Sequence, residues 1–178
     1  MEIAVRILFL LGGLTLLAVW RKTGETPGGY VLFKHLSLKA RVAVTLAIVV
    51  GGLQFVGVGV GTFYMPFERV LGLLIFCGGI ALGAWGKLTL GPNWDPSEDS
   101  RPLVTWGAYD LCRHPIYLGG YLAAVGAEIA LGSILALLAI PGLFVLRAAA
   151  ISEEEMLIAH FGEEYRDYRR RVRRFVIF

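Results

Sequence analysis

The stretch Leu103 to Gly120, LVTWGAYDLCRHPIYLGG, decides how the chain folds, because it gathers cationic, polar and aromatic side chains between long apolar segments. Arg113 and His114 stand directly before Pro115, which favours extended backbone in the preceding residue and suits the first turn of a helix. The spacing therefore predicts a helix that begins at about Pro115. Tyr117 would project from the same side one turn further in.

The Arg113 and His114 pair at this helix mouth has two interpretations. A guanidinium offers planar donors to an anion, and an imidazole donates or accepts a proton near neutral pH, as a binding or catalytic site requires. The same pair is also typical of the cytoplasmic end of a membrane helix, with Tyr117 in the aromatic belt. Spacing alone leaves both interpretations open.

The composition around this stretch is that of a membrane protein. Of the 178 residues, 56% are apolar and 17% charged, and the mean hydropathy is +0.66. Soluble domains contain roughly 25% charged residues. We therefore expect an all-α, polytopic membrane bundle that forms a single domain over residues 1–178 and leaves no room for a separate soluble catalytic domain.

Five apolar segments could cross a bilayer, which takes about 20 helical residues. A signal peptide is a weaker alternative for the first, because WRKTGE offers no small-residue cleavage site. Glycines in the third segment should let neighbouring helices approach closely. The expected spans are residues 3–20, 42–60, 70–90, 116–131 and 134–150.

The last two spans should form a tight helical hairpin, since only Gly132 and Ser133 separate them. Pro141 should kink the second helix of this hairpin by removing one backbone hydrogen bond. Glu128 lies inside the fourth span, where an ionisable group is either functional or snorkels toward the nearer surface.

Two polar segments lie before and after the last two spans. Residues 91–113 form a long loop rich in Pro, Asn and Asp, which indicates irregular backbone lying over the helix mouths. Beyond Ala150 the apolar and aromatic residues keep a spacing of three to four, so the last helix should continue to about His160. A break at Gly162 and a second helix from about Glu163 would fold the tail, residues 151–178, against the mouth.

The basic residues predict the orientation. All but Arg6 and Arg69 of the seventeen Lys and Arg fall in the connector of residues 21–41, in the 87–113 region, or from Arg147 onward in the last helix and the tail, which places these segments on one side. Five spans then put the N-terminus outside and the C-terminus in the cytoplasm. The high pI of about 9.0 reflects this topology and contact with anionic lipids rather than nucleic-acid binding. Cys77 and Cys112 should not form a disulfide in this setting.

Three motifs occur in order along the second half of the chain: LVTWGAY at 103–109, RHPIYLG at 113–119, and EE, L, FG, Y and Y spaced over 153–168. Together they resemble the LVTxGxY, RHPxYxG and EExxL…FGxxYxxY signatures of the isoprenylcysteine carboxyl methyltransferase and phospholipid methyltransferase superfamily. The resemblance covers about residues 88–172. The first two apolar segments match no signature.

This resemblance implies an enzyme that transfers a methyl group from S-adenosylmethionine to a lipid-like acceptor in the membrane, a carboxylate as in isoprenylcysteine carboxyl methylation. It also implies a cofactor pocket closed by the loop and the tail. We expect neither a metal nor a nucleic acid as a partner. The residues that it assigns to cofactor contact are Leu103, Val104, Gly107, Tyr109, His114, Tyr117, Glu153 and Glu154.

The catalytic residues follow from the chemistry of the acceptor. A carboxylate nucleophile needs a cation to position it, and Arg113 and Arg147 are the candidates. The superfamily commonly has an Arg four residues before the paired Glu, whereas this chain has Ala149 there, so either Arg147 substitutes for it or the acceptor differs.

Two alternatives stay open at this point. The first is a phospholipid or amine N-methyltransferase, for which His114, Glu153 or Glu154 would accept the proton. The second is a non-enzymatic membrane protein, a small transporter or an assembly factor, built around Glu128 and Pro141.

Overall fold

The computed structural model describes residues 2–22, 66–91, 93 and 102–176. Within these ranges the chain is helical and has no strand, so the expected all-α class is confirmed for them. The elements in chain order are α1 (Glu2–Lys22), α4 (Pro66–Leu90), α5 (Ala108–Leu111), α6 (Pro115–Ala130), the 3-10 helix η1 (Ile134–Leu138), α7 (Ala139–Phe161) and α8 (Glu163–Arg171).

Helices coincide with four of the five expected spans, and the remaining one, residues 42–60, lies outside the described residues. Two helical stretches of the described chain are long and apolar enough to cross a membrane, Phe67–Leu90 and Ile134–Phe161. The helix α6 has 16 residues, fewer than the roughly 20 that a perpendicular crossing requires. Membrane character is therefore supported, while the number of crossings stays a prediction.

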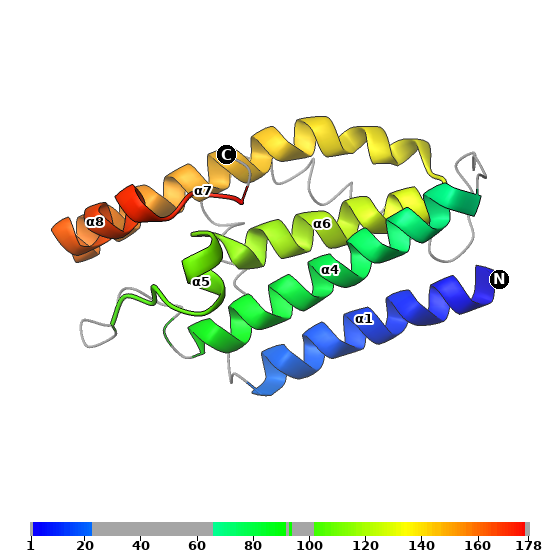
Figure 1. Ribbon diagram of the computed structural model, residues 1–178, viewed down its shortest axis with the longest axis horizontal. Coiled ribbons are helices and arrows are strands. Elements are labelled where there is room, and N and C mark those ends of the chain that lie inside the picture. Colours follow the sequence, from blue (N-terminus) through cyan, green and yellow to red (C-terminus); the bar gives the residue numbers. More distant parts are fainter. Residues whose placement is uncertain (1, 23–65, 92, 94–101, 177–178) are drawn as a thin grey trace.

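Glycines bring α4 and α6 into direct backbone contact at the centre of the bundle (Figure 1). A Cβ atom added to Gly119 would lie 2.7 Å from the carbonyl oxygen of Gly79, and one added to Gly126 would lie 2.7 Å from that of Gly72. Such distances leave no space for a side chain. The close helix approach expected from the glycines of the third span is thus confirmed.

The hairpin between α6 and α7 differs from the expected one. Ser133 turns the chain, and its Oγ accepts a hydrogen bond of 3.1 Å from the Leu135 amide at the start of η1. Because α7 begins only at Ala139, Pro141 lies in its first turn, where an amide N–H has no partner within the helix. The expected kink through a lost bond at Pro141 is therefore wrong, and the irregularity is the 3-10 segment before it.

The tail folds as the spacing predicts. The helix α7 ends at Phe161, Gly162 adopts a φ of 57°, and α8 begins at Glu163. Together with a ψ of −123°, this positive φ would strain an L side chain, so glycine suits the position. Residues 172–176 then turn back along α7 toward the start of α6 (Figure 1). The start of α6, the short helix α5 and the tail therefore meet at one end of the bundle.

Candidate active site

His114 lies at the mouth of α6, in the position predicted from the Pro that follows it. It precedes the first helical turn with φ −129° and ψ 60°, and Pro115 occupies the first helical position. Its buried imidazole stacks on the ring of Tyr117, with centroids 5.4 Å apart and planes at 12°. Phe175 from the tail approaches the same ring, at a centroid distance of 6.1 Å. The imidazole is thus fixed from two sides.

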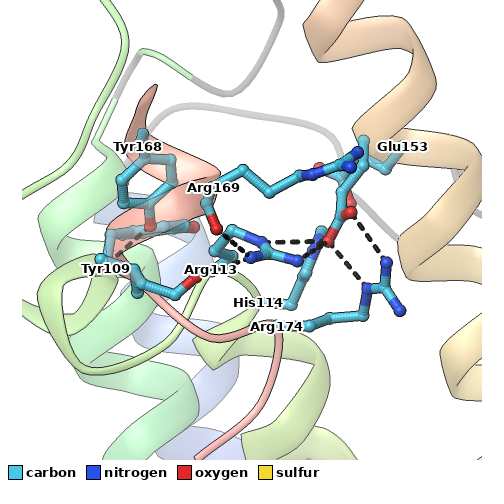
Figure 2. A network of polar contacts seen from close by, with 9 residues as sticks. Tyr109, Arg113, His114, Glu153, Tyr168, Arg169 and Arg174 are labelled. Atoms are coloured by element: carbon cyan, nitrogen blue, oxygen red, sulfur yellow. Dashed lines mark hydrogen bonds and ion pairs between the residues drawn. The ribbon is translucent and has the colours of Figure 1, made fainter. Parts of the chain in front are cut away.

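Glu154 of α7 provides a buried negative charge beside this ring. Its side chain is only 2% exposed, and its Oε1 lies 3.2 Å from His114 Nε2. Arg113 donates to Oε1 from Nε at 3.1 Å and from Nη2 at 2.8 Å, and Arg174 donates to both oxygens at 2.8 and 2.9 Å (Figure 2). A carboxylate is tolerated in such a buried place only with partners of this kind.

Arg113 connects the Glu154 carboxylate to the tail. Its Nη1 donates to the carbonyl oxygens of Arg169 at 3.0 Å and Val172 at 2.6 Å, at the C-terminal end of α8. Its backbone N–H donates to the carbonyl of Arg173 at 2.9 Å. A cation is favourable at this end of a helix, where carbonyl groups lack partners. The guanidinium is therefore largely occupied by contacts within the protein.

Glu153 approaches the other nitrogen of the same imidazole. Its Oε2 lies 3.4 Å from His114 Nδ1, and its side chain is 37% exposed. This Oε2 atom is buried, yet it has no hydrogen-bond partner among the described residues, and the same holds for the hydroxyl of Tyr165 on α8. Buried polar atoms are rarely left unsatisfied. Each of these two atoms therefore has an unused capacity for a hydrogen bond.

The surroundings of His114 favour its charged form. Burial lowers the pKa of His114, but its contacts with the Glu153 and Glu154 carboxylates outweigh burial and raise this pKa above the ordinary value of 6.5. The imidazolium then donates from Nε2 to Glu154, and its Nδ1 pairs with Glu153 by charge at 3.4 Å without a hydrogen bond. Burial and, after it, the charge of Glu154 raise the pKa of Tyr165, which keeps that hydroxyl protonated and able to donate.

The segment before α5 meets the tail beside this cluster. Leu103 and Val104 are both buried, and Leu103 packs against Tyr165 and Tyr168. The hydroxyl of Tyr168 donates a hydrogen bond to the backbone carbonyl of Tyr109 (Figure 2). The loop and the tail are thus held together, as the resemblance implies for the two segments that would close a pocket.

The backbone conformation and the packing at position 107 both require a glycine. It adopts a φ of 61° directly before α5, and an added Cβ atom would lie 2.9 Å from the Thr89 side chain at the end of α4. A larger residue would strain the backbone and collide with α4. Contact between Gly107 and a cofactor stays a prediction.

The structure brings most of the expected residues together and leaves one apart. Arg113, His114, Tyr117, Glu153 and Glu154 form one cluster, with Tyr109 and Leu103 at its edge. Arg147 is exposed on α7, seven residues before Glu154 and so on nearly the same face of the helix. It does not belong to the network around Glu154.

Sequence reasoning missed Arg174 and Phe175. Both lie in the run RVRRF, where nothing in the spacing separates one Arg from its neighbours. Only the return of the chain after α8 brings Arg174 to Glu154. No group of three or more His, Cys, Asp or Glu that could hold a metal ion occurs in the part of the chain that the structure describes.

Comparison with known proteins gives a family. The model of the phospholipid methyltransferase family matches residues 67–164, more than half of the chain. The protein-S-isoprenylcysteine O-methyltransferase of Mus musculus is 34% identical over 108 residues, and that of Homo sapiens is 33% identical over 110 residues. The cobalt-zinc-cadmium resistance protein CzcN of Cupriavidus metallidurans is 31% identical over 116 residues.

These relatives are longer than the segment they share with this chain. The match covers 57% of this chain and 38% of the mouse protein, 58% and 39% for the human protein, and 62% and 50% for CzcN. The shared region includes the motifs around His114 and Glu154, as the resemblance of these motifs indicated. The chain therefore belongs to the phospholipid methyltransferase family.

Proposed function

We propose that this protein transfers a methyl group from S-adenosylmethionine to a lipid-like acceptor in the membrane, and that the acceptor is a carboxylate, as in isoprenylcysteine carboxyl methylation. One observation carries the proposal: the buried Oε2 of Glu153 accepts no hydrogen bond among the described residues. This atom lies 3.4 Å from His114 Nδ1, where the motif at 113–119 meets the motif that begins at Glu153. The names of the mouse and human relatives support methyl transfer to a prenylated cysteine.

The residues present fit this cofactor. S-adenosylmethionine has amino and ribose hydroxyl groups that donate hydrogen bonds, and Glu153 Oε2 is an acceptor that makes no hydrogen bond among the described residues. The Tyr165 hydroxyl offers a donor to an acceptor group of the ligand. Leu103, Val104, Gly107, Tyr109 and Tyr117 would line the remainder. When bound, the cofactor supplies a methyl group activated by its sulfonium, and the protein has to align it with the acceptor and exclude water.

The charge states in the cluster suit an acceptor that is already deprotonated. Glu154 is saturated by Arg113, Arg174 and His114, and the raised pKa of His114 makes it a poor proton acceptor near neutral pH. An amine acceptor would have to deliver its proton to Glu153. We assign Glu153 to the cofactor, which leaves no base for an amine. A carboxylate acceptor releases no proton and needs no base.

Arg147 is the cation that we assign to the acceptor carboxylate. Arg113 is occupied by Glu154 and by carbonyls of the tail, so it acts as a positioning residue. Arg147 is exposed on the apolar part of α7, about two turns from Glu154, where a charged side chain is costly in a bilayer unless it has a function. We expect Arg147→Gln to raise the KM of the acceptor while the affinity for S-adenosylhomocysteine stays the same.

We further propose five crossings, with the N-terminus outside and the C-terminus in the cytoplasm. The helices α1 and α4 run in the same direction, α6 runs in the opposite direction, and α7 runs in the direction of α4 again (Figure 1). Parallel neighbours in sequence need a return crossing between them, and residues 42–60 are apolar and long enough to provide it. Cysteine labelling from one side should reach residues 24–29 and 166–174 alike, and opposite labelling would contradict this topology.

Binding of S-adenosylhomocysteine to the detergent-solubilised protein, measured by calorimetry, is the first test. Saturable binding is expected. A well-folded protein that binds none would remove the methyltransferase proposal and favour a transporter or an assembly factor.

The product of the reaction decides the acceptor class. Purified protein would be incubated with methyl-labelled S-adenosylmethionine and either an S-farnesyl cysteine with a free carboxylate or the same compound with a carboxamide. A carboxyl methyl ester releases volatile methanol in alkali, whereas an N-methyl group does not. We expect alkali-labile label with the carboxylate and none with the carboxamide. A parallel incubation with phosphatidylethanolamine tests the alternative, and alkali-stable label on that lipid would instead establish N-methylation.

A further inference from the structure

Residues 172–176, which follow α8, return to the candidate site and cover it. The carbonyl of Arg173 accepts the backbone N–H of Arg113 at 2.9 Å. The buried ring of Phe175 faces the His114 ring at 6.1 Å. Figure 1 shows this segment running back along α7 toward the start of α6. We refer to residues 172–176 as the strap.

Arg174 makes the strongest contact between the strap and α7. Its Nε and Nη2 donate to Oε1 and Oε2 of Glu154 at 2.8 and 2.9 Å, so one guanidinium meets both oxygens (Figure 2). A two-pronged bond of this kind fixes orientation as well as distance. The Arg174 side chain is 20% exposed, whereas that of Glu154 is 2% exposed, so the bond closes over the carboxylate from its outer side.

Oε1 of Glu154 also contacts Arg113 and His114, which directly precede α6. Glu154 directly follows Glu153, whose Oε2 contacts His114. A displacement of Arg174 would therefore act on the imidazole and on both carboxylates at once. The neighbouring Arg173 has an exposed side chain and contributes only its backbone to this network.

We propose that Arg174 is a positioning residue, whose two bonds to Glu154 hold the strap across the candidate site and thereby keep His114 and Glu153 in place for the cofactor. The closure of the strap is a property of the folded chain alone. The effect on the cofactor rests on the proposed function. The two parts need separate readouts.

Cys112 reports on the strap without any cofactor. Its side chain is fully buried, and it directly precedes Arg113, whose N–H is bound to the strap. Cys77 is exposed and would be replaced by Ser, so that maleimide labels Cys112 alone. In the full-length protein in detergent, Arg174→Gln should speed this labelling by about tenfold or more, because the rate follows the population of the open form.

Two further variants make the labelling test specific. Arg173→Gln removes the same charge one residue away and should label at the wild-type rate. Arg174→Lys should label at an intermediate rate, since an ammonium cannot reproduce the paired geometry, and it carries the test where Arg174→Gln does not fold. Equal labelling rates in wild type and the Arg174 variants, or rapid labelling of wild type, would contradict the proposal that Arg174 holds the strap closed.

The affinity for S-adenosylhomocysteine tests the positioning role. Arg174→Gln should weaken it several-fold relative to Arg173→Gln, with partial recovery in Arg174→Lys and an unchanged KM for the acceptor. Faster labelling with unchanged affinity would overturn the positioning role. A wild-type protein that binds no S-adenosylhomocysteine would overturn the proposed function and the positioning role together, while the labelling rates still decide whether Arg174 holds the strap.

Discussion

The hydroxyl of Tyr168 donates a hydrogen bond of 2.6 Å to the backbone carbonyl of Tyr109, across 59 positions of the chain. Tyr168 belongs to α8 and Tyr109 to α5, so this bond joins the tail to the loop that precedes the site. Tyr165, one turn earlier on α8, is buried in the same cluster but its hydroxyl has no partner among the described residues. Two neighbouring tyrosines thus have different energetic roles.

Tyr168→Phe should lower the stability of the protein by about 1–3 kcal/mol, because it leaves a partly buried carbonyl without its donor. Thermal unfolding in detergent would measure the change. Tyr165→Phe is the matched control, because it removes the same group from a tyrosine whose hydroxyl makes no hydrogen bond among the described residues. It should leave the melting temperature nearly unchanged. Equal losses in both variants would show that ring packing alone is measured.

Glu153→Gln should weaken the binding of S-adenosylhomocysteine by about 1–3 kcal/mol, because its Oε2 accepts no hydrogen bond from the described residues and is the acceptor that we assign to the ligand. Calorimetry measures the affinity and thermal unfolding the stability. Glu155 is exposed on the next position of α7, so Glu155→Gln is the matched control for the change in charge. If the two variants bind equally well, Glu153 does not contact the cofactor.

Glu154→Gln should instead destabilise the fold, by about 3–5 kcal/mol, because two guanidinium groups and an imidazolium would lose their buried counter-charge. Any loss of cofactor affinity would then follow from the loss of structure. Unfolding by heat, compared with Glu153→Gln at the same pH, distinguishes the two carboxylates. A Glu154 variant as stable as wild type would show that the network contributes little.

The raised pKa of His114 predicts a pH dependence of stability. A group whose pKa is higher in the folded state stabilises the protein fully below its ordinary value of 6.5, and this contribution is lost as the pH rises through the folded pKa. The melting temperature of wild type should therefore exceed that of His114→Gln most at about pH 6, and the difference should shrink toward pH 9. Taking the difference between the two proteins removes the titration of other groups. A gap that widens with pH would contradict the charged form.

Gly119→Ala should destabilise the bundle by about 1–3 kcal/mol, because its Cβ atom would collide with the backbone of α4 at Gly79 and Gly83. Gly120 is adjacent on α6 and has open space around its Cα. Gly120→Ala should be neutral or slightly stabilising, since Ala also favours a helix. Similar melting temperatures for both variants would mean that α4 and α6 can separate at low cost.

Local rules predicted much of this fold. Pro115 at the first helical position, the break at Gly162 and the close contact of glycines in α4 each follow from the chemistry of one residue type. The kink at Pro141 was wrong because its effect depends on where α7 begins, and the 3-10 turn from Ile134 to Leu138 has no clear local signal.

The motif residues of the site were found because their spacing is distinctive, but the partners that satisfy them were not. Arg174 reaches Glu154 only through the turn of the chain after α8, and the sequence gives equal weight to each Arg of RVRRF. Contacts of this kind depend on tertiary packing, which local periodicity does not encode. Glu154 is paired with Arg174, whereas Glu153 lies 3.4 Å from the His114 ring. This difference between adjacent carboxylates likewise depends on the folded surroundings.

The glycine contacts of α4 and α6 restrict the route by which a long hydrocarbon chain can enter. Where two backbones touch, as at Gly79 and Gly119, no prenyl or acyl chain can slip between the helices. The opposite side of α6 faces α7, and there the contact is made by side chains, such as the Tyr121 hydroxyl on the carbonyl of Ala139. Side chains can rotate aside within nanoseconds, whereas packed backbones cannot. Under the proposed function, we therefore expect a hydrophobic acceptor to enter sideways from the lipid between α6 and α7, the helix that also carries Arg147.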